Sequence, residues 1–427
     1  MEILEKTISI ITTVLTILVF YKSILTIIGV LCKKKKFPDT DIKKKYTFVL
    51  PARNEEDVLP NLIESILNLD YPKELFDIIV IADNCTDNTA KVAKDAGAIV
   101  YERFDDTKKR KGYALQYLFN LLIEEGKLNN SDAYIIVDAD NLLRKDFLIE
   151  INKGFVENKN IVCAYRSCKN FNTNFISGSY GIHFFRSTVS MHRPRAILGT
   201  GTHLAGTGIC IGSHLLQNGW NYTKLTEDTE LSADLVSKNI TIGFVEDAVL
   251  YDEQPTNFLI AFRQRVRWAK GRLSVFFTTF PKVFFSIFKG IFKHKSLRST
   301  FTAYDFFFYY FPYGLFTLLL SLVVPIASLV LYFIDNSNGF EILNLLKSFG
   351  ISLLGSYVSS LLLGFVYVIR EHKKINCSVG LIILYTFLWP WFDMVDAYIT
   401  LYALLKRKVT WKQIPHNDTR KVESLKK

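Results

Sequence analysis

Paired cysteines of the kind that bind zinc or exchange electrons are missing from this chain. Its 427 residues contain six cysteines at irregular positions, without a CxxC pair or a metal-ligand spacing. Cys163 and Cys168 are close in sequence, but they fall in a region that we expect to face the cytosol. We therefore predict reduced, structural thiols and no disulfide framework.

The first residues lack the basic cluster and the small-x-small cleavage site of a signal peptide. The apolar run Ile8–Cys32 has about 25 residues, which is too long for such a peptide and long enough to cross a hydrocarbon layer of about 30 Å. Lys33–Lys36 follow it directly, and lysines favour the cytoplasmic side. Residues 1–36 are thus predicted to hold a transmembrane helix with its N-terminus outside.

Acidic residues are outnumbered, so the chain has a formal net charge of +11. Hydrophobic residues make up 49%, and they cluster towards the two ends of the chain. The basic residues gather beside these apolar segments, at Lys33–Lys36, Lys43–Lys45, Lys373–Lys374 and Lys406–Lys408. Such flanks are typical of cytoplasmic anchors facing anionic lipid. We expect membrane lipids, and not nucleic acid, as partners.

The middle of the chain, from Lys43 to about Val249, alternates between short β-rich runs and helical runs. The predicted strands are Tyr46–Leu50, Phe76–Ile81, Ala98–Tyr101 and Ala133–Val137, and the predicted helices are Glu56–Asn68, Thr86–Asp95 and Gly112–Ile123. Strands separated by helices imply βαβ crossovers. We predict an α/β domain over residues 37–272 with a doubly wound, mostly parallel sheet.

Apolar segments return in the C-terminal half. Ser274–Phe292 is rich in phenylalanine with interspersed lysines, which predicts an amphipathic helix in the membrane interface. Phe306–Phe333 and Ile342–Val368 are predicted to span the membrane. Their connection, Ile334–Glu341, has no Lys or Arg and is expected outside.

The last apolar stretch, Cys377–Leu405, is too short for two crossings, because about 29 residues rise only 1.5 Å each. A single crossing would place the basic tail outside, against the positive-inside tendency. Pro390, Asp393 and Asp396 suggest a break followed by an interfacial helix, or a re-entrant element, with the tail on the cytoplasmic side. The predicted regions after the α/β domain are 273–299 (interfacial), 300–405 (membrane) and 406–427 (tail).

Two acids, Asp138 and Asp140, follow the strand Ala133–Val137 directly. Carboxylates just past the carboxyl end of a strand lie at the crevice where doubly wound sheets bind ligands. They can hold Mg²⁺ or Mn²⁺, which neutralises a diphosphate leaving group. A solvated acidic turn is the alternative for these two residues taken alone.

Further acids occur at two other loop positions. Asp83 ends the second predicted strand and can accept a hydrogen bond from a nucleobase or ribose, while Asp87 caps the next helix. Thr226–Asp228 follows a glycine-rich stretch, Gly199–Gly212, whose backbone can approach a ligand closely. Asp228 can serve as a general base, although the same residues also suit a helix N-terminus.

Gln264, Arg267 and Trp268 fall on one face of a helix, at positions i, i+3 and i+4. Arg267 can pair with a diphosphate, and Trp268 offers a stacking face for a sugar ring. The alternative is a basic amphipathic helix at the lipid surface. That alternative accounts for the flanking basic residues but poorly for Gln264 and Trp268.

Taken in order, these residues resemble the family 2 glycosyltransferases of the GT-A fold, in particular the membrane synthases of cellulose, hyaluronan and poly-N-acetylglucosamine. The resemblance covers Tyr46 to Arg272. The matching motifs are Pro51–Glu55, Asp83, Lys111–Leu115 (KG-x-AL), Asp138 and Asp140 (DxD), Asp228 (TED) and Gln264–Trp268 (QxxRW). Three departures are Ala82, where an acid often precedes Asp83, Asn141, where the cellulose branch often has a histidine, and the lack of a cyclic-nucleotide-binding domain after the membrane region.

The resemblance implies an inverting transfer from a UDP-sugar with Mg²⁺ or Mn²⁺. In that scheme Asp228 removes the acceptor proton, and Asp138 and Asp140 hold the metal. The implied nucleotide-sugar-binding residues are Pro51, Arg53, Glu55, Asp83, Lys111, Asp138, Gln264, Arg267 and Trp268. The QxxRW motif accompanies processive synthases more than single-addition enzymes, so we expect a growing polysaccharide as acceptor. Transfer of one sugar to a lipid is the alternative.

Two other classes of protein fit the sequence less well. A nucleotide-regulated transporter is disfavoured because the apolar segments have few of the ionisable residues that mark an ion path. A DxD phosphatase normally needs a threonine where Leu142 stands. We expect a multi-pass membrane protein whose catalytic domain lies in the cytoplasm.

Overall fold

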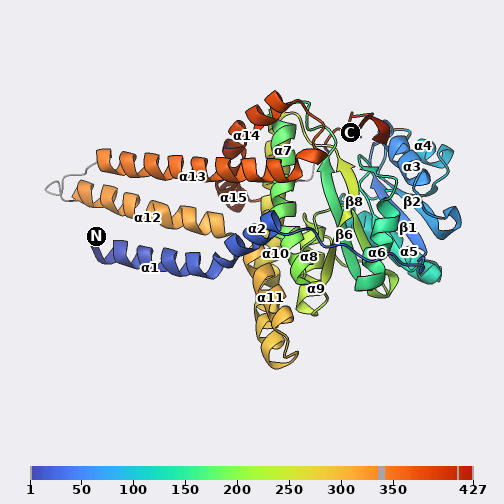
Figure 1. The fold of residues 1–427 in the computed structure, drawn as a ribbon, viewed down its shortest axis with the longest axis horizontal. Coiled ribbons are helices and arrows are strands. Elements are labelled where there is room, and N and C mark those ends of the chain that lie inside the picture. Colours follow the sequence, from blue (N-terminus) through green and yellow to red (C-terminus); the bar gives the residue numbers. More distant parts are fainter. Residues whose placement is uncertain (1, 335–341, 411–412, 426–427) are drawn as a thin grey trace.

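The computed structural model describes residues 2–334, 342–410 and 413–425. The α/β part, built around an eight-stranded sheet, lies at one end of the molecule, and long helices extend from it at the other (Figure 1). The chain crosses between these two parts at residues 32–45 and again after β8.

The sheet has the strand order β3-β2-β1-β4-β7-β6-β8-β5. Its first half is parallel, as predicted, and consists of β3 (Ile99–Arg103), β2 (Phe76–Asp83), β1 (Tyr46–Ala52) and β4 (Ala133–Ile136). The second half is mixed, because β7 (Ile209–Gly212) runs antiparallel to β4 and β6 (Ile161–Cys168), and β5 (Leu142–Leu143) runs antiparallel to β8 (Ile242–Asp252). The parallel βαβ half and the mixed second half together form the GT-A fold.

Helices cover both faces of the sheet. They are α3 (Leu59–Leu67), α4 (Thr89–Asp95), α5 (Lys111–Glu124), α6 (Phe147–Asn158) and α9 (Glu227–Ser237). Alternate residues of β1 enter two separate cores, since Phe48 and Leu50 pack on one face and Val49 on the other. Leu59 and Leu62 lie on one face of α3 and are fully buried against the sheet.

Between β6 and β7 the chain forms α7 (Phe175–Arg186), a π-helical segment (Ser187–His192) and α8 (Arg193–Leu198). The helices outside the α/β part are α1 (Glu2–Val19), α2 (Tyr21–Leu31), α10 (Phe258–Phe292), α11 (Leu297–Tyr310), α12 (Tyr313–Ile334), α13 (Ile342–Glu371), α14 (Val379–Met394) and α15 (Asp396–Leu405). Among the described residues five helical segments are long and apolar enough to cross a membrane.

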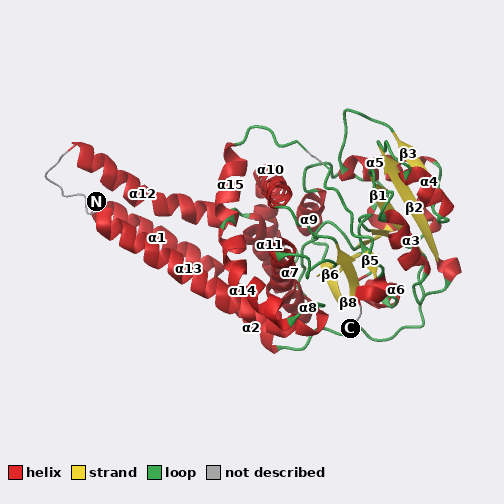
Figure 2. Ribbon diagram, turned by 90° about the horizontal axis from the view of Figure 1, so that it is seen from above, coloured by secondary structure: helices red, strands yellow, loops and turns green. Residues whose placement is uncertain are grey.

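Three of these helices, α1, α12 and α13, project from the sheet in one direction, and α10, α11, α14 and α15 lie across their base (Figures 1 and 2). The predicted span Phe306–Phe333 is divided between two helices, because Pro312 interrupts the hydrogen-bond ladder after α11. The expected break in the last apolar stretch is present at Val395. The connection predicted to be external lies outside the described residues except for Ile334.

The predicted interfacial helix also starts earlier than its phenylalanine-rich part. A single helix, α10, runs through Gln264–Trp268 and on to Phe292, so the expected boundary at residue 273 falls inside it. Its second half exposes several aromatic side chains, among them Phe277, Phe285 and Phe292. One rigid helix therefore connects the predicted site with the apolar surface.

Buried ion pairs fasten the long helices to the α/β part. Arg193 of α8 donates to Glu246 of β8 at 2.6 and 2.8 Å and also pairs with Glu371 at the end of α13. Arg195 donates to Asp305 of α11, at 2.5 and 2.6 Å. Buried charges are stable only with such well-aligned partners, so these pairs fix where the helices meet the sheet.

Candidate active site

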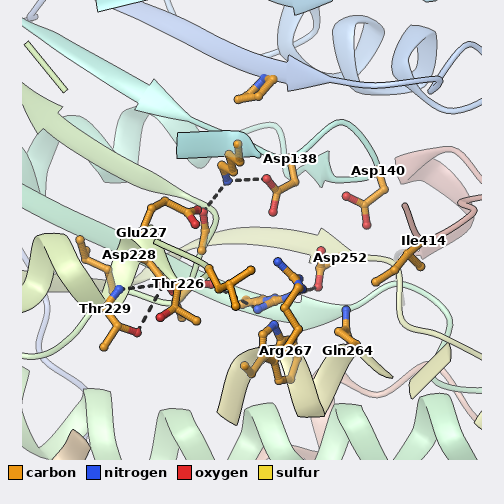
Figure 3. A pocket seen from close by; sticks show the side chains of 18 of the residues that line it. Asp138, Asp140, Thr226, Glu227, Asp228, Thr229, Asp252, Gln264, Arg267 and Ile414 are labelled. Atoms are coloured by element: carbon orange, nitrogen blue, oxygen red, sulfur yellow. Dashed lines mark hydrogen bonds and ion pairs between the residues drawn. The ribbon is translucent and has the colours of Figure 1, made fainter. Parts of the chain in front are cut away.

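A cavity of about 340 Å³ lies at the carboxyl ends of the parallel strands, between the sheet and α10 (Figure 3). Every residue that the sequence predicts to bind the donor, hold the metal or act as base lines it: Pro51, Arg53, Glu55, Asp83, Lys111, Asp138, Asp140, Asp228, Gln264, Arg267 and Trp268. The fold thus brings together side chains from β1, β2, α5, the loop after β4, α9 and α10. This is the crevice where open α/β sheets bind ligands.

Asp138 is held by a lysine from the start of α5. Lys111 Nζ donates to Asp138 Oδ1 at 2.5 Å and to the carbonyl oxygen of Gly206 at 2.7 Å. Burial alone would lower the pKa of Lys111, but Asp138 and Glu227 outweigh it and raise the pKa. The lysine therefore stays charged and connects the DxD loop with the glycine-rich loop.

Asp140 is buried among other acids. Burial is the main cause that raises its pKa to about 8; the neighbouring Asp252 raises it further, and His416 opposes the shift. Asn141 does not point to a ligand position, since its amide donates to Asp252 Oδ1 at 2.7 Å and accepts from Thr207 at 2.6 Å. Asn141 therefore supports the acids and is not aimed at the cavity.

These acids suit a divalent cation. No three His, Cys, Asp or Glu side chains in the described ranges converge in metal-binding geometry. Asp138 and Asp140 nevertheless present hard oxygen donors on one loop, and their mutual repulsion with Asp252 favours a bound positive charge. The residues therefore fit Mg²⁺ or Mn²⁺ in the presence of the two phosphates that would complete its coordination.

Asp228 lies in the first turn of α9, next to Glu227 (Figure 3). Its Oδ1 accepts from Thr229 N at 2.7 Å, so it satisfies a free amide of the helix start and still lines the cavity. Asp228 can therefore stabilise the helix N-terminus and still be placed to act as a general base. Burial raises the pKa of Asp228, and burial together with the charge of Asp228 raises the pKa of Glu227 to about 7.

One glycine lets α10 approach this acidic turn. A Cβ at Gly271 would lie 2.4 Å from Thr226 Cγ2, so only glycine permits the contact. The close packing brings Gln264 and Arg267 opposite Asp228 and Asp252 across the cavity (Figure 3).

Two members of the QxxRW motif have distinct surroundings. The Oε1 atom of Gln264 is buried and has no hydrogen-bond partner within the described chain. Trp268 packs edge-on against Tyr180 at 5.9 Å between ring centroids, which fixes its ring at the cavity wall. An unpaired buried amide oxygen and a fixed aromatic wall both suit a polar ligand.

At the opposite end of the cavity, Asp83 is paired with Arg103 of β3. Burial raises the pKa of Asp83, while Arg103 and Arg53 oppose the shift. Within the described residues its hydrogen bonds from Asn84 and Arg103 both use Oδ1, which leaves Oδ2 to face a ligand. The sequence pattern did not indicate this arginine partner.

The tail after α15 contributes residues that sequence reasoning missed. Gln413 Nε2 donates to the carbonyl oxygens of Arg53 and Asn54 at 2.7 and 3.0 Å, and His416 Nδ1 lies 3.1 Å from Glu55. Burial opposes the charge on His416, yet Asp140 and Glu55 outweigh it and raise its pKa to about 10. Gln413, Ile414 and His416 all line the cavity. The tail and the site therefore lie on the same side of any membrane.

No spacing in the sequence indicated this arrangement, because the tail is separated from its partners by most of the chain. It is docked by Asp418, whose backbone N–H donates to Glu253 Oε2 at 3.1 Å, and by Val422 and Leu425, which pack against Leu142.

If the donor nucleotide is UDP, as the sequence resemblance implies, removal of residues 413–427 should weaken its binding by roughly tenfold or more, because the cavity loses the Gln413 hydrogen bonds to the Arg53–Asn54 backbone and the His416–Glu55 contact. Isothermal titration with UDP measures the loss. Lys421→Ala, which breaks only an exposed pair with Glu64, should change the affinity little. Equal affinity of the truncated and full-length proteins would show that the tail is only packed beside the site.

The fold and the cavity define a GT-A glycosyltransferase. Residues 44–271 match the glycosyltransferase-like family 2, and the chain belongs to that family. It is 25% identical to the probable glycosyltransferase YdaM of Bacillus subtilis over 390 residues, which cover 86% of each protein.

Two further relatives match over somewhat more than half of this chain. Identity is 24% to a β-monoglucosyldiacylglycerol synthase of Nostoc (57% of this chain, 53% of the relative) and 25% to a poly-β-1,6-N-acetyl-D-glucosamine synthase of Staphylococcus epidermidis (53% and 54%). The chain thus spans about half the length of these two relatives. Among solved structures it resembles the mannosyltransferase PcManGT of Pyrobaculum calidifontis in complex with GDP-Man and Mn²⁺, with a TM-score of 0.55, 13% identity and coverage of 91% and 98%.

Proposed function

We propose that this protein transfers a sugar from a UDP-sugar to an acceptor hydroxyl at the membrane surface, with inversion at the anomeric carbon. The observation that supports it best is the single cavity in which the DxD acids, Asp228 and the Gln264–Trp268 motif face one another. The same cavity is lined by α10 and α11, the helices at the base of the projecting ones. Donor and acceptor can therefore meet at one place.

The donor lies along the sheet in this proposal. Asp83 accepts a hydrogen bond from the uracil or ribose, and Pro51, Arg53 and Glu55 line the nucleotide. Lys111 and Arg267 face the diphosphate from opposite sides, and Gln264 and Trp268 contact the sugar. Asp138 and Asp140 would hold Mg²⁺ or Mn²⁺, which neutralises charge on the departing diphosphate.

Asp228 removes the proton of the acceptor hydroxyl as the acceptor oxygen bonds to the anomeric carbon. A base opposite the leaving group requires attack from the far face of the sugar, and such a single displacement inverts the configuration. Arg267 stabilises the phosphate charge that develops when the bond to UDP breaks.

The acceptor that the architecture favours is a lipid. Only 6% of the apolar segment of α12 is buried, 11% of that of α1–α2 and 22% of that of α13, so the described part of these helices leaves most of its apolar surface uncovered. Uncovered apolar surface suits helices surrounded by lipid better than the wall of a polymer channel. The β-monoglucosyldiacylglycerol synthase among the relatives acts at a lipid, as its name states.

Processive polysaccharide synthesis is the second candidate, and it was the one that the sequence favoured. It is supported by the QxxRW motif on α10 and by the similarity to poly-β-1,6-N-acetyl-D-glucosamine synthase. The two candidates share every side chain of the cavity, so they differ in the product and not in the site.

UDP release by the protein in nanodiscs with Mn²⁺, measured against a panel of UDP- and GDP-sugars, tests the proposal. Turnover with one UDP-sugar and one added sugar on a lipid product supports single transfer. A ladder of sugars or a high-mass product supports the synthase. Turnover with GDP-sugars alone would contradict the UDP assignment.

The pH dependence follows from the buried acids. Because Asp228 acts only as a carboxylate, transfer should fall as the pH drops through its raised pKa. The acidic limb of kcat should therefore lie above about pH 3.9, near which an ordinary aspartate titrates. A pH profile of kcat at saturating donor checks this, and an acidic limb at or below the pKa of an ordinary aspartate would contradict it.

A further inference from the structure

The end of the cavity formed by α7, α10 and α11 is lined by two arginines to which the proposed transfer chemistry gives no role. Arg186 is the last residue of α7, and Arg272 lies on α10 beyond Arg267. Phe184, Met191 and Tyr309 also line the cavity and add apolar surface beside the polar His183 and Ser187. A cationic and apolar lining suits an amphiphile with an anionic headgroup.

The arginines at this end share their acidic partners. Arg186 pairs with Asp393, while Arg265 and Arg272 share Asp396 at 3.3 and 3.4 Å. These three arginines are here named the arginine cluster. Among the described residues Arg272 donates to Asp396 through one nitrogen alone, so the rest of its fork can meet a ligand. Arg267 lies towards the donor end, where Glu227 and Asp228 attract it.

The other titratable group at the cluster adds no charge. His183 on α7 lies within electrostatic range of Arg186, Arg265, Arg272 and Asp396, and burial first and the three arginines next keep its pKa well below the usual range. His183 is therefore neutral near pH 7, and the arginines remain the charged donors that a ligand at this end would meet.

The cluster lies beside the proposed base. Gly271 packs against Thr226, the residue before Glu227 and Asp228, and Arg272 follows Gly271 directly. A group bound to Arg272 therefore lies close to a hydroxyl that is positioned for Asp228.

From this placement we infer that the acceptor is a hydroxyl on the headgroup of a phosphate-bearing lipid, with the phosphate held by Arg272 and Arg186. The inference rests on the proposed function and names its acceptor class. A phosphodiester or diphosphate matches the planar fork of arginine and accepts charge-assisted hydrogen bonds from it. Diacylglycerol and a neutral glycan have no charge to offer the cluster.

The reaction remains a simple displacement. The proton of the headgroup hydroxyl passes to Asp228, the hydroxyl oxygen bonds to the anomeric carbon, and the bond from that carbon to UDP breaks. UDP leaves with the electron pair. The lipid phosphate stays intact and serves only to hold the acceptor.

The full-length protein in phosphatidylcholine nanodiscs tests the inference. With a UDP-sugar that is turned over, each disc is supplemented with phosphatidylglycerol, a polyprenyl-diphosphate-linked sugar, diacylglycerol or glucosyldiacylglycerol, and the labelled lipid products are separated. Transfer to one of the two phosphate lipids, but not to the neutral ones, is expected. The first two arms distinguish a glycerophospholipid from a lipid-linked sugar.

Variants separate the role of the arginines from folding. Arg272→Gln, and the charge-balanced Arg186→Gln/Asp393→Asn, should raise the acceptor KM at least tenfold while the UDP affinity stays unchanged. Arg263→Gln, on an exposed part of the same helix, is the matched control and should match the unsubstituted protein. Unchanged UDP affinity also shows that the variants are folded.

Two outcomes overturn the inference and leave sugar transfer standing. One is transfer to a neutral lipid as efficient as to the phosphate lipids, and the other is UDP-sugar turnover without transfer to either phosphate lipid. An acceptor KM that the arginine variants do not change also overturns it. Failure to bind or turn over any UDP-sugar would instead refute the proposed function itself.

Discussion

Asp228→Asn should abolish sugar transfer and leave UDP binding nearly unchanged. A general base acts on the acceptor proton, so its loss should reduce kcat by about 100-fold or more. Asparagine keeps the size of the side chain and can still accept from Thr229 N, which preserves the first turn of α9. The comparison needs kcat with the preferred donor and the UDP dissociation constant of the same preparation.

The matched control is Glu230→Gln on the same helix. Glu230 accepts from Lys224 N at 3.1 Å and does not line the cavity, so its substitution should leave transfer intact. Normal turnover by Asp228→Asn would refute the assignment of the base. In that case Glu227, the adjacent acid in the cavity wall, becomes the group to replace.

Asp140→Ala should weaken Mn²⁺-dependent UDP binding by roughly tenfold or more, because the cation loses one of its two carboxylates on the DxD loop. In EDTA the variant and the unsubstituted protein should bind UDP equally weakly. Titration calorimetry with and without Mn²⁺ measures both conditions.

Asp146→Ala provides the control for this second prediction. Asp146 follows the same loop, pairs with Arg144 and lies outside the cavity, so UDP affinity should not change. If Asp140→Ala bound UDP as tightly as the unsubstituted protein in Mn²⁺, Asp140 would be removed from the cation site.

Much of the site was predictable because many of its residues stand at strand ends or on a helix face, and the local sequence alone indicates such places. Asp83 and Asp138 come at or just after the ends of parallel strands, and such ends meet at one edge of a sheet. Gln264 and Arg267 share a helix face whatever the helix packs against. Periodicity also placed β1, β2, β3 and β4 correctly, since their apolar runs are short and bounded by turns.

Predictions that depended on distant contacts were less complete. The span expected over Phe306–Phe333 is two helices, and the interfacial helix begins well before its phenylalanine-rich part. The hydrophobicity of a segment reflects only its composition. It does not show that α11 packs against α10 through Phe276 and Phe307. Where an apolar helix lies is decided by its neighbours.

The sequence by itself determined the order of the βαβ units and the positions of the acids at strand ends, because backbone geometry and hydrophobic periodicity operate over a few residues. Only the tertiary structure decided which of these acids are buried together, and burial with like charges is what raises the pKa of Asp140 and Glu227. It also decided that Gln413 and His416 complete the cavity and that Arg272 lies beside the TED turn. Those contacts join residues far apart in the chain, so the spacing of residues along the sequence does not indicate them.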